Sequence, residues 1–292
     1  MLQLQVIREN PEEIIRRLAI KNFDAAEIIP GIIALDDKRK EIQKQLDDSQ
    51  AQANSIAKEI GVLFQKGQAS EAAALKEKTA ELKNLSRDLA TTLEEVKKNL
   101  DDQLVRVPNL PHLSVPAGKS AEDNEIVATE GTIPVLPEGS MPHWDLAAKY
   151  DIIDFGLGVK ISGAGFPVYK GKGARLQRAL INFFLEEAIE AGYTEIQPPH
   201  LVNAASGYGT GQLPDKDGQM YYAPLDDLYL IPTAEVPVTN IYRDVILKEG
   251  DFPIKNVAYS SCFRREAGSY GKDVRGLNRL HQFDKVEIVQ IA

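Results

Sequence analysis

The sequence predicts an α+β fold, in which an antiparallel sheet with flanking helices follows a long antiparallel helical hairpin (a coiled coil). Residues 32–104 repeat apolar side chains at alternating steps of three and four, which is the seam of a coiled coil. Residues 256–291 hold two runs rich in β-branched and aromatic side chains around a loop dense in glycine and arginine, which favours a strand hairpin. Prolines from Pro108 onwards separate the two patterns, because proline ends helices. We therefore expect two domains, over residues 1–107 and 108–292.

Composition is that of an ordinary globular protein, with 43% hydrophobic and 26% charged residues among 292. The net charge of −9 argues mildly against a protein that simply coats nucleic acid, although a local basic patch could still bind RNA. The single cysteine, Cys262, excludes a disulfide within the chain and a cysteine cluster for zinc. There is no signal-peptide pattern, and no run approaches the roughly 18 apolar residues of a membrane span. We therefore expect a cytoplasmic protein without a membrane partner.

The N-terminal domain is predicted to be helical throughout. Asn10-Pro11 signals a helix start, with asparagine as N-cap and proline at the first helical position. Two long helices follow, over about 32–65 and 70–104, and the short turn near Gly67 makes them antiparallel. The expected seam comprises Leu35, Ile42, Leu46, Ala53, Ile56, Ile60 and Leu63 in the first helix, Leu75, Leu82, Leu85, Leu89, Val96 and Leu100 in the second, and Arg39 and Ser49 as polar members.

The pattern alone leaves two functions open for this helical hairpin. Most such coiled coils serve dimerisation or act as scaffolds. Acidic residues slightly outnumber basic ones in it, so the hairpin is not basic overall. Local clusters that could contact RNA phosphates do occur. They consist of Lys38, Arg39, Lys40 and Lys44 in the first helix and Lys97 and Lys98 in the second.

Shorter elements are expected between the hairpin and the C-terminal strands. In order, these are a strand at Ile126–Ala128, a short helix over His143–Tyr150, a strand and turn over Phe155–Phe166, an amphipathic helix over Gly173–Ala191 and a strand from Thr194. Gly192 follows the amphipathic helix as a C-cap. The last strand ends at two consecutive prolines, Pro198 and Pro199.

The predicted strand hairpin brings charged side chains to the ends of its strands. Residues two apart on a strand point to one face, so Arg264 and Glu266 share a face, which Glu287 on the partner strand could share as well. Such a face offers a cation for phosphates and carboxylates for amines or hydroxyls. The alternative for an isolated Arg-x-Glu is a salt bridge at the end of a strand.

The segment from Phe263 onwards resembles motif 2 of the class II aminoacyl-tRNA synthetases. It has the order of that motif: an aromatic residue, Arg264, any residue, Glu266, a loop, Arg279, and then Phe283 followed by an acidic residue. Upstream, Thr233-Ala234-Glu235 within IPTAEVPVTN resembles the serine-binding signature of the bacterial-type seryl-tRNA synthetases. The helix and strand that end at Pro198-Pro199 resemble motif 1, which builds the dimer interface in that class. The resemblance covers nearly the whole chain.

The resemblance implies a class II antiparallel sheet and a serine–tRNA ligase. In such an enzyme ATP activates L-serine to seryl-adenylate, and serine is then transferred to tRNA(Ser), and to tRNA(Sec) where that exists. It also implies ATP and Mg²⁺ as cofactors, a homodimer, and a helical hairpin that binds the tRNA. No Walker-type phosphate loop is present, so ATP binding must either use the class II mode or be absent.

The roles of individual residues also come from this resemblance. Arg264 would be the catalytic residue, holding the α-phosphate of ATP and the carboxylate of serine, for which a planar and permanently charged guanidinium is suited. The implied serine-binding residues are Thr233, Ala234, Glu235, Arg264 and Glu287; the ATP-binding residues are Arg264, Arg265, Glu266 and Phe283; and the loop that meets the acceptor end of tRNA carries Lys272, Arg275 and Arg279. Phe283 would stack on adenine, with an ordinary strand core residue as the alternative. Thr233 could instead cap a helix that begins at Ala234. Arg265 is expected on the opposite face of the strand.

The chain stops just after the second strand of the hairpin, before the place of motif 3 in this family. We therefore expect a truncated chain, with the Mg²⁺ ligands in the missing C-terminal part and no metal site within these residues. One alternative is a non-catalytic RNA-binding or dimerisation protein derived from a synthetase. Another is an amino-acid ligase for a carrier protein, against which the long hairpin and the lack of zinc-type cysteines and histidines argue.

Overall fold

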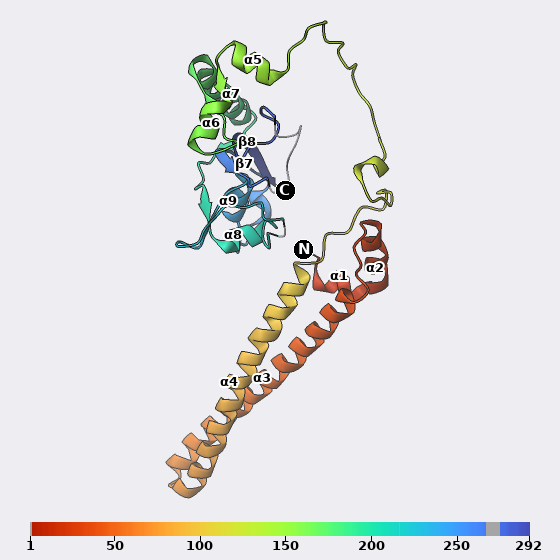
Figure 1. The fold of residues 1–292 in the computed structure, drawn as a ribbon. Coiled ribbons are helices and arrows are strands. Elements are labelled where there is room, and N and C mark those ends of the chain that lie inside the picture. The colour runs from red at the N-terminus through yellow and green to blue at the C-terminus, as the bar shows by residue number, and fades with distance from the viewer. Residues whose placement is uncertain (1, 216, 267–274) are drawn as a thin grey trace. The chain divides into compact units, whose positions relative to one another are not determined.

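The computed structural model describes residues 2–215, 217–266 and 275–292 (Figure 1). The chain forms two compact units, Met1–Thr132 and Ile133–Ala292. Among the residues described, no helix combines the length and apolar character that a membrane span needs. The expected domain boundary after residue 107 stays a prediction.

The first unit is helical up to Leu104, as expected. It contains α1 (Leu4–Glu9), α2 (Pro11–Ile20), α3 (Ile28–Gln65), α4 (Ala69–Leu104) and a short 3-10 turn, η1 (Ala121–Asp123). Pro11 is the first residue of α2, although the Asn10 side chain makes no capping hydrogen bond. The short helices α1 and α2 pack against the base of the long pair, where Ile7, Leu18 and Leu100 belong to one buried cluster.

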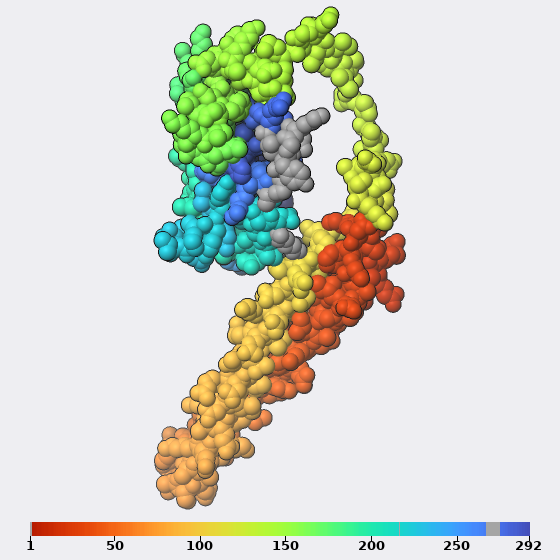
Figure 2. All heavy atoms as spheres, in the orientation of Figure 1, coloured from red at the N-terminus to blue at the C-terminus, as the bar shows by residue number. Residues whose placement is uncertain are grey.

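The long helices α3 and α4 form the predicted antiparallel hairpin, and Figure 2 shows their side chains filling the space between them. Ile42 and Leu46 of α3 pack with Leu93 and Val96 of α4 in a shared buried cluster. The first helix has the predicted seam. Leu35 packs against both this cluster and the one at the base, so apolar contacts extend from the base along the helix pair.

One seam residue in the second helix was predicted wrongly. Leu85 is 49% exposed, and Ser86 lies at the seam in its place. The alternating steps run from Leu82 by four to Ser86 and then by three to Leu89, so Leu85 falls on the neighbouring row. The Oγ atoms of Ser86 and Ser49 lie 2.9 Å apart and form a polar layer in the coiled coil. The prediction placed Leu85 at the seam because leucine is hydrophobic. The spacing of residues along the helix places Ser86 there instead.

A buried carboxylate ties α1 to the base of the hairpin. The Asp36 side chain is 2% exposed and pairs with Arg8 Nη1 at 2.9 Å, Arg39 Nη2 at 2.8 Å and Lys40 Nζ at 2.9 Å. Burial alone would raise the pKa of Asp36, but hydrogen bonds and charge from Lys40 and Arg39 outweigh it and hold that pKa below its ordinary value. The charged carboxylate therefore stabilises the folded state.

Replacing Asp36 by asparagine is expected to lower the free energy of unfolding near neutral pH by about 2 kcal/mol, since charge-assisted hydrogen bonds to three cations are lost. Because the folded-state pKa is depressed, this stabilisation is present above the unfolded pKa of about 3.9 and is lost as pH falls through the folded pKa. The difference between wild type and variant should therefore shrink on acidification. Urea unfolding followed by far-ultraviolet circular dichroism at several pH values measures it.

Asp37 provides the matched control, because it pairs with Arg8 at 2.7 Å but is 57% exposed. Asp37→Asn should cost less than about 0.5 kcal/mol, as exposed ion pairs usually do. If both variants lose the same free energy of unfolding, the burial of Asp36 is not the reason why its ion pairs stabilise the fold.

The second unit carries small sheets surrounded by helices. Its helices are α5 (His143–Lys149), α6 (Phe155–Ile161), α7 (Gly171–Glu190), α8 (Ala204–Gly209) and α9 (Glu235–Asn240), with a 3-10 turn η2 (Glu249–Asp251). Its strands are β1 (Ile153–Asp154), β2 (Val168–Tyr169), β3 (Thr194–Glu195), β4 (Leu201–Val202), β5 (Tyr222–Ala223), β6 (Leu228–Leu230), β7 (Ile254–Phe263) and β8 (Gln282–Ile291). The described strands form sheets in the orders β1-β2, β3-β7-β8 and β4-β6-β5.

The strand hairpin predicted at the C-terminus is confirmed as β7 and β8. They pair antiparallel from Ile254↔Ile291 to Phe263↔Gln282, and β3 adds to β7 in parallel. The two faces of this sheet are covered by different helices. Ala234 and Val238, at the start of and within α9, are buried with Ala258 on one face. On the other face, Gln177 of α7 donates to Asp284, which also accepts from Tyr259 Oη at 2.7 Å.

Two of the shorter predicted elements are wrong. Ile126–Ala128 forms no strand, and Ile126 and Val127 are 82% and 90% exposed. Residues from Phe155 form the helix α6 instead of a strand, because the Asp154 side chain accepts a hydrogen bond from Leu157 N at 2.9 Å and so caps the first turn. The short helix α5 and the amphipathic helix α7 are confirmed, with Gly192 in a left-handed conformation (φ +84°) just after α7.

Candidate active site

Arg264 lies at the end of β7, on the face of the sheet that α9 partly covers. Its backbone N–H donates to His281 O at 2.9 Å, which continues the hairpin pairing one step beyond the strand. Its Nε donates to Pro232 O at 3.3 Å, and its guanidinium carbon lies 5.0 Å from the centroid of the Phe283 ring. Among the described residues, no carboxylate forms an ion pair with Arg264. The half-buried guanidinium is therefore held in place, and its two terminal nitrogens carry no hydrogen bond to the residues that the structure describes.

The salt bridge considered for Arg264 and Glu266 is not formed. Glu266 instead accepts from Arg279 Nη1 at 3.4 Å, across the base of the loop that joins β7 to β8. Glu266 also has a positive φ of +46°, so the chain leaves the extended conformation there. Arg265 is exposed, and its backbone N–H donates to Gln219 O at 2.8 Å. Glu266 thus pairs with Arg279 and not with Arg264.

A compact polar network lies further along the same face. Thr233 Oγ1 donates to Glu287 Oε2, and the backbone N–H of Glu235 donates to the same carboxylate oxygen at 3.2 Å. Lys285 Nζ donates to Thr233 Oγ1 at 2.9 Å and to Glu287 Oε1 at 2.7 Å. Thr233 is 5% exposed, whereas the Glu287 and Lys285 side chains are 17% and 33% exposed. The Thr233 end of the network is thus buried in the core, while the Glu287 and Lys285 side chains are partly exposed to solvent.

Strand register explains why these residues meet. Phe283, Lys285 and Glu287 are alternate residues of β8, and they stand opposite Cys262, Ser260 and Ala258 of β7. Those three residues of β7 are buried and small, and they form the floor of this face of the sheet. Burial raises the pKa of the Cys262 thiol, which makes it an inert part of this floor.

The hairpin therefore brings Arg264 and Glu287 to one face, as the alternation allowed, and Phe283 lies on that face too. Glu266 was expected there as well, but the chain leaves the extended conformation at that residue. Thr233 joins the face from the segment before α9. Ala234 lies buried below that segment, while Glu235 is exposed. Thr233 could alternatively have capped α9. The hydrogen bond that would do so, from Glu235 N–H to Thr233 Oγ1, is long at 3.4 Å and therefore weak. Lys285 was missed by the sequence analysis, although its place between Phe283 and Glu287 on the same face could have identified it.

The loop that joins the two strands is described only on its return side. Lys272 lies outside the described residues. Arg275 has its guanidinium carbon 5.6 Å from the centroid of the Trp144 ring, and Leu277 N donates to His143 Nε2 at 2.8 Å. Both contacts come from the first residues of α5, so α5 holds this end of the loop. Neither His143 nor Trp144 was predicted to lie there.

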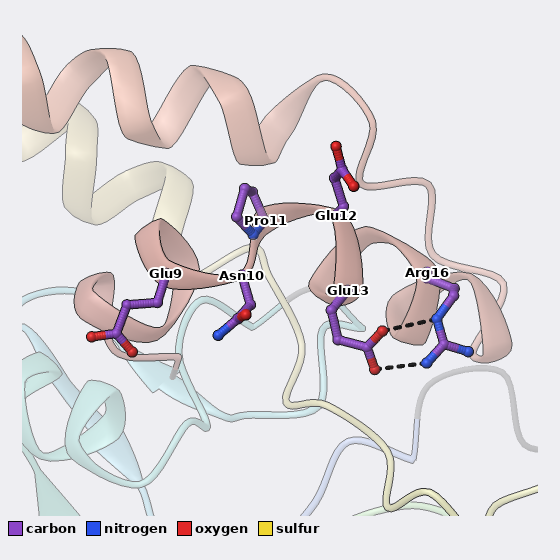
Figure 3. A pocket seen from close by; sticks show the side chains of 6 residues that line it. All are labelled: Glu9, Asn10, Pro11, Glu12, Glu13 and Arg16. Atoms are coloured by element: carbon purple, nitrogen blue, oxygen red, sulfur yellow. Dashed lines mark hydrogen bonds and ion pairs between the residues drawn. The ribbon is translucent and has the colours of Figure 1, made fainter.

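A separate polar hollow lies in the first unit, where α1 meets α2 (Figure 3). It has a volume of about 520 Å³ and is lined by Glu9, Asn10, Pro11, Glu12, Glu13 and Arg16. Its one cation, Arg16, donates two hydrogen bonds to Glu13, at 2.9 and 2.7 Å. The hollow is acidic and offers no free cation to a phosphate. Across the described part of the chain, no group of three or more histidine, cysteine or acidic side chains converges as a metal site.

Comparison with known protein families gives two matches. The family described as "Seryl-tRNA synthetase N-terminal domain" matches residues 1–111. The family described as "tRNA synthetase class II core domain (G, H, P, S and T)" matches residues 222–292. The second match includes the strand hairpin and the network around Glu287.

Individual relatives agree with these matches. A serine–tRNA ligase of Salinibacter ruber is 47% identical over all 292 residues of this chain, which cover 68% of that protein. A serine–tRNA ligase of Akkermansia muciniphila is 44% identical, again over the whole chain and 68% of the relative. The chain thus spans about two thirds of the length of these relatives.

Solved structures show the same similarity. The seryl-tRNA synthetase of Pyrococcus horikoshii, complexed with ATP, superposes with a TM-score of 0.83 at 33% identity, over 99% of this chain and 69% of that one. The cytoplasmic serine–tRNA ligase of Naegleria fowleri, in complex with AMP, has a TM-score of 0.76 at 25% identity, over 99% of this chain and 70% of that one.

Proposed function

Because the chain belongs to the seryl-tRNA synthetase family, we propose that the face described above binds serine and ATP and forms seryl-adenylate, from which serine passes to tRNA(Ser). The ligase reaction expected from the sequence is confirmed at the level of the family. The single observation that supports the site most strongly is the pairing pattern: Arg264 has no carboxylate partner among the described residues, whereas Glu287 is held by three donors close by.

The two ends of this face match the two ends of serine. A guanidinium with free terminal nitrogens suits the carboxylate of serine and the α-phosphate of ATP together. The carboxylate of Glu287 suits the serine ammonium, and the polar groups around it suit the hydroxyl. A site that bonds a hydroxyl rejects an analogue without one, since a buried polar group would be left unpaired. This is the proposed basis for choosing serine over alanine.

In the proposed reaction, a carboxylate oxygen of serine attacks the α-phosphorus of ATP and pyrophosphate leaves. The carboxylate is already a nucleophile at neutral pH, so the protein does not have to remove a proton. Catalysis then rests on positioning and on stabilising the developing charge, which we assign to Arg264. The Phe283 ring, beside the guanidinium, is assigned to adenine stacking, and Arg265 and Glu266 to further contacts with ATP.

We assign Mg²⁺ to this reaction only as the companion of ATP. The residues that the structure describes offer it no cluster of three acidic or histidine side chains, so we derive no step from it. ATP itself fits the residues present, because Arg264 supplies a cation that no carboxylate of the described residues pairs with, and Phe283 supplies an aromatic face.

The proposed partners follow from surfaces of each unit. The helical hairpin of α3 and α4 would bind the tRNA. In the second unit, Arg275, Arg279 and Lys272 are assigned to contacts with the acceptor end of the tRNA. The family resemblance adds tRNA(Sec) as a second tRNA substrate. A homodimer is supported by α7, where a row of apolar side chains is left exposed by the residues that the structure describes. Its members are Leu176, Leu180, Phe183 and Phe184, each between 46% and 56% exposed. We also place the protein in the cytoplasm, where its tRNA substrate is used.

The test of this function is serine-dependent exchange of pyrophosphate into ATP on the purified 292-residue chain, with threonine and alanine as controls. Exchange with serine well above that with either control is the expected result. A second protein should be assayed in parallel, in which the segment of the Salinibacter ruber relative that this chain does not cover is added. Absence of exchange in both proteins, while both are folded, would favour the alternative of a non-catalytic RNA-binding or dimerisation protein.

A further inference from the structure

Lys285 has no role in the function proposed so far, yet it touches both polar groups of the proposed serine pocket. An ammonium has three donors and no acceptor. Two of these donors are used, at 2.9 Å to Thr233 Oγ1 and at 2.7 Å to Glu287 Oε1. The side chain is about two thirds buried, so it is held close to these partners. Its position beside the pocket therefore has consequences for both of them.

The first consequence is the direction of the Thr233 hydroxyl proton. A hydroxyl has one proton to donate and two lone pairs. Lys285 occupies one lone pair, and Glu235 N–H lies 3.4 Å from the same oxygen. The proton is left to point at Glu287 Oε2, which accepts it. Lys285 thus turns a rotatable hydroxyl into a fixed donor.

The second consequence is the orientation of the Glu287 carboxylate. Its Oε2 accepts from Thr233 and from Glu235 N at 3.2 Å, while its Oε1 accepts only from Lys285 among the described residues. A carboxylate has about four acceptor positions, so one is left, on Oε1. A donor arriving in the pocket finds that position already oriented, which reduces the entropy lost on binding.

We infer that Lys285 is a positioning residue that orients the Glu287 carboxylate for the amino acid, both directly and by fixing the Thr233 hydroxyl that donates to it. This inference rests on the proposed function of the pocket. It assigns to Lys285 an effect on the binding of serine and none on the binding of ATP. Because Lys285 acts through Thr233 and Glu287, its effect must depend on their presence.

The experiment is a double-mutant cycle on pyrophosphate exchange, in the 292-residue chain and in the completed protein described above. Lys285→Met keeps the length of the side chain without its charge, and Thr233→Val keeps the shape without the hydroxyl. Each single change should raise the KM for serine about tenfold and leave the KM for ATP nearly unchanged. The double variant should also show a rise of about tenfold, far below the roughly hundredfold product of independent effects.

Lys255→Met is the matched control. Lys255 is a lysine of the same strand hairpin, but it pairs with Gln290 on the other face and lies 5.4 Å above the Tyr193 ring. This variant should leave the KM for serine unchanged. Multiplicative effects in the cycle, an unchanged KM for serine in Lys285→Met, or equal rises in the KM for serine and for ATP would each overturn the role of Lys285. Absence of serine exchange in both wild-type proteins would instead refute the proposed function.

Discussion

Replacing Arg264 by alanine is expected to lower serine-dependent pyrophosphate exchange by about 10³-fold or more, since a positioned arginine contributes that much to phosphoryl transfer. The guanidinium is held by Pro232 O and by the Phe283 ring, and it forms no ion pair with a carboxylate among the described residues. Its loss removes the group that we assign to both the serine carboxylate and the α-phosphate. Binding of tRNA should change little, because the proposed tRNA contacts lie on other residues. Steady-state exchange and a filter-binding assay measure the two quantities.

Two further variants sharpen this prediction. Arg264→Lys keeps the charge but loses the planar fork, so exchange should recover only in part. Arg243→Ala removes another arginine of the same unit, one that pairs with Asp244 after α9 and has no place in the proposed site, and it should leave exchange near wild type. Loss of tRNA binding together with surviving exchange would show that Arg264 is assigned wrongly.

Glu287→Gln is expected to raise the KM for serine by about 100-fold while the KM for ATP stays nearly unchanged, because charge-assisted hydrogen bonds to the amino acid are weakened. The amide keeps the shape of the carboxylate but has only one acceptor oxygen and two donors. It cannot accept from Thr233, Glu235 N and Lys285 in the present arrangement, in which both carboxylate oxygens are used. The serine ammonium then meets a neutral group beside the cation of Lys285. Exchange at varied serine and at varied ATP separates the two effects.

Glu195→Gln is the control for this prediction. Glu195 belongs to β3 of the same sheet and is exposed. The same chemical change should leave both constants as in wild type. A parallel rise of the KM for ATP in Glu287→Gln would show that the carboxylate supports the whole site and does not serve the amino acid in particular.

The helical hairpin was predictable because its pattern is local. Alternating steps of three and four need no distant partner to be recognised, and both helices begin and end within a few residues of the expected positions. The same pattern misplaced Leu85, since hydrophobicity marked a residue one position away from the true seam. It placed Ser49 at the seam but gave no reason to expect Ser86 as its partner in a polar layer.

The site was predictable in part for a similar reason. The alternation of side chains along a strand allowed Glu287 to share the face of Arg264, and the strand register decided that it does. The family resemblance added Thr233 from far upstream. The roles of these residues in catalysis stay predictions. Lys285 went unnoticed, because a lysine in a strand is usually solvated, and only its contacts with Thr233 and Glu287 distinguish it. The helix α6 was missed because the capping by Asp154 competes with a strand pattern that the sequence shows as well.

By itself the sequence determined the elements whose signals are periodic and local: the coiled coil, the amphipathic helix α7 and the paired strands β7 and β8. It also carried the motifs that identify the family. Only the tertiary structure decided which charges are paired and which are left for a ligand. Glu266 turns away to Arg279, Lys285 joins Glu287, and Arg264 keeps its terminal nitrogens free of carboxylates within the described residues. Such pairing depends on distances of a few ångströms between segments far apart in the chain, which no local pattern encodes.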